Sequence, residues 1–463
     1  MVQNPVEELK ELAREAHLDL GSQAFAKWLD TKDPLEALRE EFHYPTQAQI
    51  SRANGSDKPH PEGDDQPSIY LCGNSLGLQP KSIKHYLDEE LQVWAEGGVF
   101  GHHHHIHGRP WLTIDEHVLD ESARIVGAER SEVAIMNTLT ANVHLLMAAF
   151  YRPEGPRTKI LIEAKAFPSD RYAVESQIRW HGLDPADHLI ALAPRAGEDT
   201  LRTEDILQVI SDQGSHIALV FFSGVQYYTG QCFDMPRITE AGHSQGCMVG
   251  FDLAHAVGNV SLQLHDWGVD FACWCTYKYL NAGPGGIAGI FVHSRHGDTD
   301  SLTQLHGWWG NRVTTRFQMS DTFDPIPGSA GRFQLSNPNV LAMVSLLGAL
   351  DVFAMTDMAA LRRKSRLLTG YLEYLLQHTE PAAHQVRIIT PKDPEARGCQ
   401  LSLILDERAF SPVFNHLTAA CVVCDERKPN CIRVAPVPLY NSFADVFRFV
   451  EILCQALTEA ECA

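Results

Sequence analysis

Two segments of the chain place an aspartate and a lysine at the ends of apolar runs that are typical of buried strands. VGFDLAHAVGN, residues 249–259, carries Asp252, and CWCTYKYLNAGPGG, residues 273–286, carries Lys278. Both side chains are therefore expected at neighbouring strand ends, where loops hold most functional groups of an α/β sheet. A lysine and a carboxylate placed in this way could grip opposite ends of a flat heteroaromatic ring.

Pyridoxal phosphate is a cofactor that needs this pair. The lysine amine forms a Schiff base with it, and the carboxylate keeps its pyridine nitrogen protonated so that the ring acts as an electron sink. The same residues have a plainer interpretation, in which Asp252 caps a helix and Lys278 is a solvated loop lysine. The pair alone leaves both interpretations open.

Three further strand ends favour the cofactor interpretation. MNTLTANVHLL, residues 136–146, opens a helix near Thr140, whose hydroxyl and neighbouring N–H groups suit a phosphate. Phe167 could stack on a pyridine ring, and Ser169 follows it. Ser223 ends another apolar run, where a small hydroxyl can meet a ligand at close range. Thr140 and Ser169 could equally be ordinary helix caps.

The elements that must position these residues alternate between strand and helix. From Ile69 onward, short β-type runs separate amphipathic helical patterns, which predicts an α/β fold with a mainly parallel sheet covered on both faces. We expect an N-terminal helical segment over residues 1–68 that packs with the small domain and contains a flexible polar loop at 51–66. A large domain over 69–334 and a small α+β domain over 335–463 should follow.

The composition excludes several classes of function. The 463 residues are 44% hydrophobic and 21% charged, which is typical of a globular protein, and the net charge of −20 disfavours nucleic acid and anionic lipid as partners. The apolar runs are too short for a membrane span. The N-terminus reads as an acidic amphipathic helix and not as a targeting signal. An odd number of cysteines, 11, favours a reducing cytoplasm over a disulfide framework.

Other clusters suggest chemistry that we consider weaker. The histidine run at 102–107 could bind a transition metal adventitiously, and we expect no designed metal site. Cys421, Cys424 and Cys431 have part of a zinc-site spacing, but buried structural thiols are favoured. Cys399 opens an apolar run, whereas the nucleophile of a cysteine desulfurase lies in a mobile loop.

With these motifs in view, the chain resembles the kynureninase family of pyridoxal-phosphate hydrolases, which has the fold-type-I architecture of the aspartate aminotransferases. The resemblance spans roughly residues 70–450 in family order. It rests on GNSLGLQPK (73–81), RPW (109–111), NTLTAN (137–142), AFPSDRYAVESQ (166–177), FSGVQYYTGQ (222–231), FDLAHAVGN (251–259), WCTYKYLNAGPGG (274–286), LSNPN (335–339) and IRVAPVPLYNSF (432–443).

The resemblance implies a role for each matching residue. Lys278, Tyr277 and Asp252 would be catalytic. Ser75, His102, Asn337 and Arg433 would bind the substrate, with Arg433 as the clamp for its α-carboxylate. The cofactor would be held by Leu139, Thr140, Phe167, Pro168, Ser169, Asp170, Ser223, Asp252, His255, Tyr277, Lys278, Trp308 and Asn337. His102 is taken from a stretch that is longer than the family pattern, and Trp308 from two adjacent tryptophans.

The implied protein is a homodimer with shared active sites, in which Trp308 and Asn337 reach the cofactor of the partner subunit. The implied reaction is hydrolytic cleavage of L-kynurenine or its 3-hydroxy form. A seven-stranded, mainly parallel sheet domain would carry the cofactor. Another pyridoxal enzyme, such as an aminotransferase or a desulfurase, and a metal-binding or inert scaffold are the alternatives.

Overall fold

The computed structural model describes residues 4–55, 65–297 and 302–461. They form two compact units, which we call the large unit (Ser82–Tyr227 and Cys232–Ala354) and the small unit (Met1–Lys81, Tyr228–Gln231 and Met355–Ala463). Each unit has its own sheet and its own buried apolar core.

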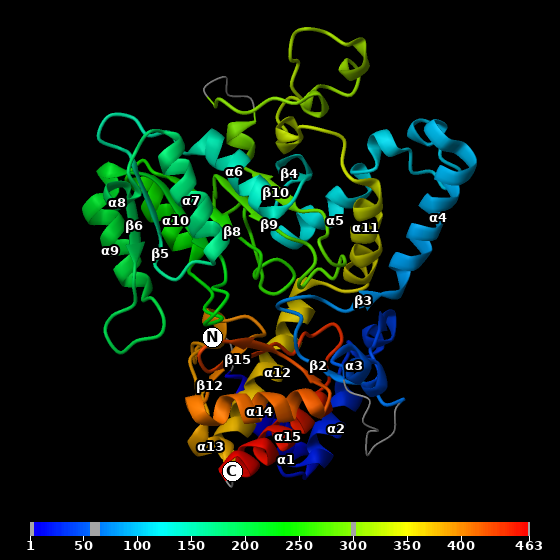
Figure 1. Cartoon of the computed structure of the whole chain (residues 1–463), viewed down its shortest axis with the longest axis vertical. Coiled ribbons are helices and arrows are strands. Elements are labelled where there is room, and N and C mark those ends of the chain that lie inside the picture. The colour runs from blue at the N-terminus through cyan, green and yellow to red at the C-terminus, as the bar shows by residue number, and fades with distance from the viewer. Residues whose placement is uncertain (1–3, 56–64, 298–301, 462–463) are drawn as a thin grey trace. The chain divides into compact units, whose positions relative to one another are not determined.

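The large unit is built on a seven-stranded sheet in the order β4-β10-β9-β8-β7-β5-β6 (Figure 1). Only β10 runs antiparallel to its neighbours, so the predicted mainly parallel sheet is confirmed. The strands are β4 (Val133–Ile135), β5 (Lys159–Glu163), β6 (Leu189–Leu192), β7 (Ile217–Ser223), β8 (Met248–Asp252), β9 (Phe271–Trp274) and β10 (Gly289–Val292).

These strands form where the sequence is continuously apolar. In β7 the six residues before Ser223 are all buried, as expected of a parallel strand that is covered on both faces. Apart from Lys159 at the start of β5, charged and hydroxyl-bearing residues appear only where β5, β7 and β8 end. The helices of the unit are α4 (Lys81–Gly97), α5 (Glu116–Val126), α6 (Leu139–Phe150), α7 (Pro168–Trp180), α8 (Pro185–His188), α9 (Thr203–Gln213), α10 (Met235–Ser244) and α11 (Val340–Ala354).

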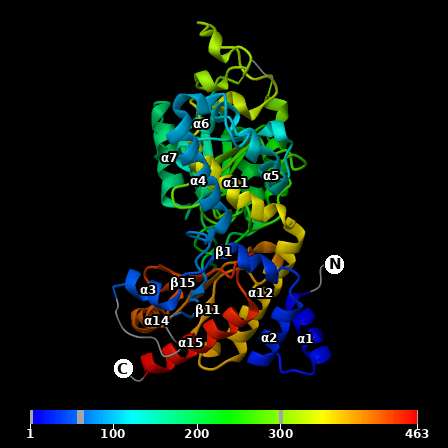
Figure 2. The same ribbon diagram turned by 90° about the vertical axis from the view of Figure 1, so that its right-hand side faces the viewer.

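The small unit contains a four-stranded antiparallel sheet in the order β11-β12-β15-β14. Helices α1 and α2 pack against α12 and α15, which places the N-terminal segment in this unit (Figure 2). The sheet strands are β11 (Arg387–Ile388), β12 (Leu401–Ile404), β14 (Asp425–Arg427) and β15 (Cys431–Val434), and the short strands are β1 (Phe42–His43), β2 (Ile69–Tyr70), β3 (Gln79–Pro80) and β13 (Val422–Val423). The helices are α1 (Pro5–Ala16), α2 (Gln23–Lys32), α3 (Gln47–Ala53), α12 (Met358–His378), α13 (Ala382–Gln385), α14 (Glu407–Ala419) and α15 (Phe443–Glu461).

The unit boundaries differ from the expected domains at 69–334 and 335–463. The structure places α11 in the large unit because it packs against α5, and the boundary therefore falls after Ala354. Residues 69–81 belong to the small unit because β2 pairs with β13. Most of the expected flexible loop, residues 56–64, lies outside the described residues.

Among the described residues, no single helix is both long and apolar enough to cross a membrane. Only α11 and α12 taken together, across the break at residues 355–357, reach that length and apolarity.

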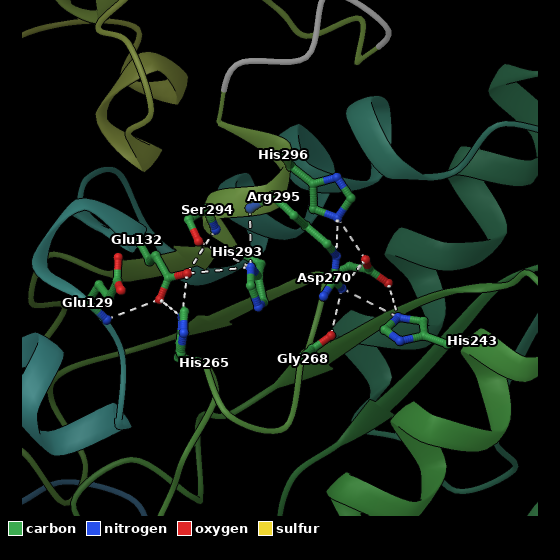
Figure 3. A network of polar contacts seen from close by, with 10 residues as sticks. All are labelled: Glu129, Glu132, His243, His265, Gly268, Asp270, His293, Ser294, Arg295 and His296. Carbon is green, nitrogen blue, oxygen red and sulfur yellow. Dashed lines mark hydrogen bonds and ion pairs between the residues drawn. The ribbon is translucent and has the colours of Figure 1, made fainter.

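A network of acidic and basic side chains ties together the edge of the large sheet where β4, β8 and β9 begin (Figure 3). The buried carboxylate of Asp270 accepts hydrogen bonds from Arg295 at 2.5 Å and from the Val249 N–H at 2.7 Å, and it pairs with His296 at 2.7 Å and His243 at 2.9 Å. We call it the amino-edge network, and its members are Glu129, Glu132, His243, His265, Gly268, Asp270, His293, Ser294, Arg295 and His296.

Candidate functional site

The opposite edge of the same sheet carries three buried carboxyl groups and a lysine. Glu163 ends β5, Asp252 ends β8, and Asp170 lies in the first turn of α7, with exposed fractions of 4%, 5% and 6%. Lys278 lies in the loop after β9, with its Nζ atom 5.9 Å from the centre of the Phe167 ring. Because parallel strands end at one edge, the fold brings together residues that are far apart in the sequence.

Asp170 and Asp252 share a hydrogen bond in which Asp170 is the donor. Burial and the neighbouring Asp252 carboxylate raise the pKa of Asp170 well above its usual range, which favours the protonated form of Asp170. Burial also raises the pKa of Asp252, but three favourable contacts oppose it: the Ala254 N–H at 2.7 Å from Oδ1, the charge of Lys278, and the Asp170 hydrogen bond. Of the two aspartates, Asp252 is therefore the one whose ionised form has the more favourable contacts.

Glu163 is a site residue that the sequence analysis missed. Its carboxyl group accepts hydrogen bonds from the Ser223 hydroxyl and from the Ser223 N–H, the latter at 3.4 Å. Burial raises the pKa of Glu163, and the nearby charge of Asp252 acts in the same direction. The signal for it was a charged residue at the end of the run KILIE, in line with Ser223 and Asp252 at the ends of the neighbouring strands.

Two hydroxyl groups meet where α6 and α7 begin. Thr140 Oγ1 lies 2.8 Å from Ser169 Oγ, although the N-terminal cap positions of these helices are Thr138 and Phe167. Because Thr140 and Ser169 are not at these cap positions, the interpretation of the two residues as ordinary caps is wrong. Neither Thr138 nor Phe167 accepts a side-chain hydrogen bond from its helix. Two hydroxyls beside two helix N-termini fit a phosphate group.

Aromatic side chains surround the lysine. Tyr277 precedes Lys278, whose Nζ lies 6.0 Å from the centre of the Tyr277 ring, and burial raises the pKa of this tyrosine. Phe167 has 45% of its side chain exposed and contacts Tyr227 edge-on at 5.2 Å. His255 is buried in the turn after β8, with its ring 6.2 Å from that of Tyr279.

The two adjacent tryptophans have different environments. Trp309 is buried, and the Arg316 guanidinium lies 4.1 Å from its ring centre, whereas Trp308 is 41% exposed. Asn337 is exposed as well. The predicted pair, Trp308 and Asn337, is thus available at the surface of a single chain.

The histidine run folds against α4. His105 and Trp111 both bond to the buried Glu90 carboxylate, at 2.9 and 2.8 Å, and Arg109 bonds to Glu90 at 3.1 Å. His102 packs edge-on against Trp111 at 5.2 Å, and a side chain at Gly101 would collide with the same indole. The Gly101–His102 pair is therefore fixed against the tryptophan of the RPW motif.

Ser75 and Arg433 lie in the small unit. Ser75 is exposed, in a loop whose Cys72 forms a bridge with Ala435, two residues after Arg433. Arg433 is buried in β15 and forms an ion pair with Asp425, a residue that the sequence analysis did not select.

One group of possible metal ligands occurs among the described residues. The ligand atoms of Glu132, His265 and His293 lie within 4.8 Å of one another, and the histidine run at 102–107 contributes none of them. Glu132 accepts hydrogen bonds from the N–H groups of Ser294 and Glu129 and bonds to His265 at 2.9 Å. These contacts account for the cluster as part of the amino-edge network.

Solved structures with this architecture include cysteine desulfurases. The chain matches the desulfurase CsdA of Escherichia coli with a TM-score of 0.71 at 16% identity, covering 92% of this chain and 98% of that one. The desulfurase of Thermococcus onnurineus gives 0.70, also at 16% identity, over 85% and 95%. The fold, with a lysine and a carboxylate at one edge of the sheet, defines the chain as a member of the fold-type-I class of pyridoxal-phosphate enzymes.

Relatives with higher sequence identity show the family of the chain. Kynureninases of Mus musculus and Homo sapiens are 50% identical to it over 99% of this chain and 98% of theirs, and that of Monosiga brevicollis is 53% identical over 96% and 98%. The profile of the kynureninase C-terminal domain matches residues 361–453. The chain belongs to the kynureninase family.

Proposed function

We propose that this chain is a pyridoxal-phosphate enzyme that hydrolyses L-kynurenine to anthranilate and L-alanine, or 3-hydroxykynurenine to 3-hydroxyanthranilate and L-alanine. The observation that carries the proposal is the meeting of Asp252, Asp170 and Lys278 at the edge of the large sheet where its parallel strands end. Half of the residues are identical to those of proteins named kynureninase over nearly the whole chain. This reaction belongs to tryptophan catabolism and NAD biosynthesis.

We call the edge of the large sheet where β5, β7, β8 and β9 end the carboxyl-end edge. The residues at this edge fit the cofactor. Thr140, Ser169 and the N-termini of α6 and α7 would hold its phosphate, Phe167 would face its ring, and Asp252 would hold a proton on its pyridine nitrogen. Pyridoxal phosphate supplies, when bound, an electron sink for negative charge that develops at the substrate α-carbon. The proposed cofactor-binding set also contains Leu139, Pro168, Asp170, Ser223, His255, Tyr277 and Lys278, together with Trp308 and Asn337.

The catalytic roles are assigned to Lys278, Tyr277 and Asp252, of which Lys278 and Tyr277 would move protons. Lys278 Nζ would hold the cofactor through its amine, and the same amine, when free, would take the α-proton of the substrate. The Tyr277 hydroxyl keeps its proton at neutral pH because burial raises its pKa, so it can serve as a proton donor. Arg433 would bind the α-carboxylate, while Ser75, His102 and Asn337 would contact the aromatic end.

We further infer a cytoplasmic homodimer without nucleic-acid or membrane partners, in which Trp308 and Asn337 contribute to the cofactor site of the partner. The exposure of both side chains supports this role. It explains why one of two adjacent tryptophans is exposed while the other is buried.

The test is to supply the purified holoenzyme with kynurenine alone and to assay alanine and anthranilate. Stoichiometric formation of both products is expected. A requirement for an added keto acid would instead identify an aminotransferase. Formation of alanine from cysteine, with sulfide released when a thiol reductant is added, would identify a desulfurase, although Cys399, the residue considered for that role, is fully buried.

A further inference from the structure

The sheet of the small unit has one apolar and one polar face around Arg433. Alternate residues of a strand point to opposite faces, and Ile432 and Val434 lie in the apolar core. On the other face, Arg433 stands between Ser402 of β12 and Asp425 of β14, which are its register partners. Arg433 is thus flanked on both sides by oxygen-bearing side chains.

Asp425 links two arginines on this polar face. Its Oδ2 atom accepts hydrogen bonds from Arg433 and lies 3.0 Å from NH2 of Arg427, which is two residues along the same strand. The side chains of Arg433 and Asp425 are only 1% and 10% exposed, whereas that of Arg427 is 38% exposed. Together the three groups carry a net charge of one positive unit at neutral pH.

Burying a guanidinium without a counter-charge is costly, and an arginine side chain has four rotatable bonds to fix. The Asp425 contact offsets the first cost and reduces the second, because it holds one end of the guanidinium plane. The contact is made through NH2, at one end of the planar guanidinium with its five N–H donors. A carboxylate bound to Arg433 would therefore meet a group whose plane is already set.

We propose that Asp425 is a positioning residue for the α-carboxylate clamp: it orients Arg433, and the positive charge of the Arg427–Asp425–Arg433 triad attracts the carboxylate. The inference deepens the proposed function, since it assumes that Arg433 binds an amino-acid carboxylate. It concerns neither the cofactor nor the bond that is cleaved.

The strand supplies a matched control. Glu426 is the next residue of β14, has the same charge as Asp425, and points to the other face, where it pairs with exposed Lys428 at 3.2 Å. Asp425→Asn and Glu426→Gln each remove one negative charge from the same strand, so a general charge effect would appear in both.

The experiment measures how tightly the holoenzyme binds L-alanine and ethylamine, which differ by the carboxylate, through the change in cofactor absorbance. In wild-type protein we expect a strong preference for alanine. Asp425→Asn should reduce the ratio of the two affinities about tenfold, the effect of one lost charge-assisted contact, and should raise the KM for kynurenine with little change in kcat. Glu426→Gln should keep the wild-type ratio.

Arg433→Lys supplies the second arm. If Asp425 acts through Arg433, the double variant Asp425→Asn/Arg433→Lys should have the same ratio as Arg433→Lys alone. Additive losses would show that Asp425 acts independently of Arg433. A wild-type ratio in Asp425→Asn, an increased ratio, or an equal loss in Glu426→Gln would each overturn the proposal.

Two other outcomes, an inactive wild-type protein and a variant that does not fold, can be distinguished from these results. Failure of the wild-type protein to hydrolyse kynurenine would count against the proposed function, while the alanine-to-ethylamine ratio would still report on the clamp. If Asp425→Asn does not accumulate as folded holoenzyme, Asp425→Glu keeps the charge and displaces it by one methylene. A wild-type ratio in that variant would then contradict the positioning role.

Discussion

At the scale of single residues, the proton between Asp170 and Asp252 determines what the carboxyl-end edge can do. An ionised carboxylate can keep a pyridine nitrogen protonated, and a neutral acid cannot. The hydrogen bond from Asp170 helps Asp252 to remain ionised although it is buried, together with the Ala254 N–H and Lys278. The two aspartates therefore have different tasks despite their common chemistry.

Replacing Asp252 tests this difference. Asp252→Asn should still bind the cofactor but lose at least about 100-fold in turnover, because an amide does not hold a proton on the pyridine nitrogen. Asp170→Asn is the matched variant, and it should lose less, since its amide N–H can still donate to Asp252. Steady-state kinetics and visible spectra of both variants report the result. Equal losses would show that the two aspartates are not distinguished by their protonation.

Arg433 leads to a second prediction at this scale. Arg433→Lys replaces a planar, bidentate donor by a point charge, and we expect a loss of about 2–4 kcal/mol of transition-state binding with unchanged cofactor absorbance. The loss should appear in both substrate affinity and turnover. Wild-type kinetics would mean that another residue binds the carboxylate, and a missing visible band would mean that Arg433 is structural.

At the scale of elements, the sequence predicted the seven strands of the large sheet because buried parallel strands are continuously apolar. It could not predict which unit α11 joins, since a helix that is apolar on nearly all sides fits either core. The sequence analysis missed Glu163 and Asp425 for a different reason. Each becomes a site residue only through its neighbour across the sheet, Ser223 or Arg433, and strand register is not visible in one sequence.

Asp270 at the start of β9 yields a prediction about pH. Its bonds to His243, His296 and Arg295 lower its pKa despite burial, so it stabilises the fold above the unfolded value of about 4, and this contribution declines as the pH falls toward the folded value. Asp270→Asn should lower the free energy of unfolding at pH 7 by about 3–5 kcal/mol and flatten the acid limb of the stability profile.

Urea unfolding of the wild type and of Asp270→Asn, from about pH 8 down to about pH 2, measures both effects because this window extends below the unfolded pKa of about 4. The control is Asp205→Asn, which breaks a surface pair with Arg195 at 2.6 Å and should have little effect. If both variants have the same stability, the amino-edge network does not hold the sheet edge together.

At the scale of the whole molecule, the site is proposed to need two copies of the chain. Trp308→Ala and Lys278→Ala should each be nearly inactive alone. Mixed and reassociated, they should recover about a quarter of wild-type activity, because about half of random dimers are hybrids and each hybrid holds one intact site. The assay is hydrolysis after refolding of equimolar chains, with each variant refolded alone as the control. No recovery would place Trp308 in the site of its own subunit.

In the large sheet, the candidate functional site and the amino-edge network lie at opposite edges. The residues proposed to bind the cofactor are therefore not the residues that keep the strands together. Loops after β5, β7, β8 and β9 can change without touching Asp270, Glu132 and their partners. Such a scaffold is evolvable, and libraries confined to those loops should yield folded variants far more often than libraries that include the amino edge.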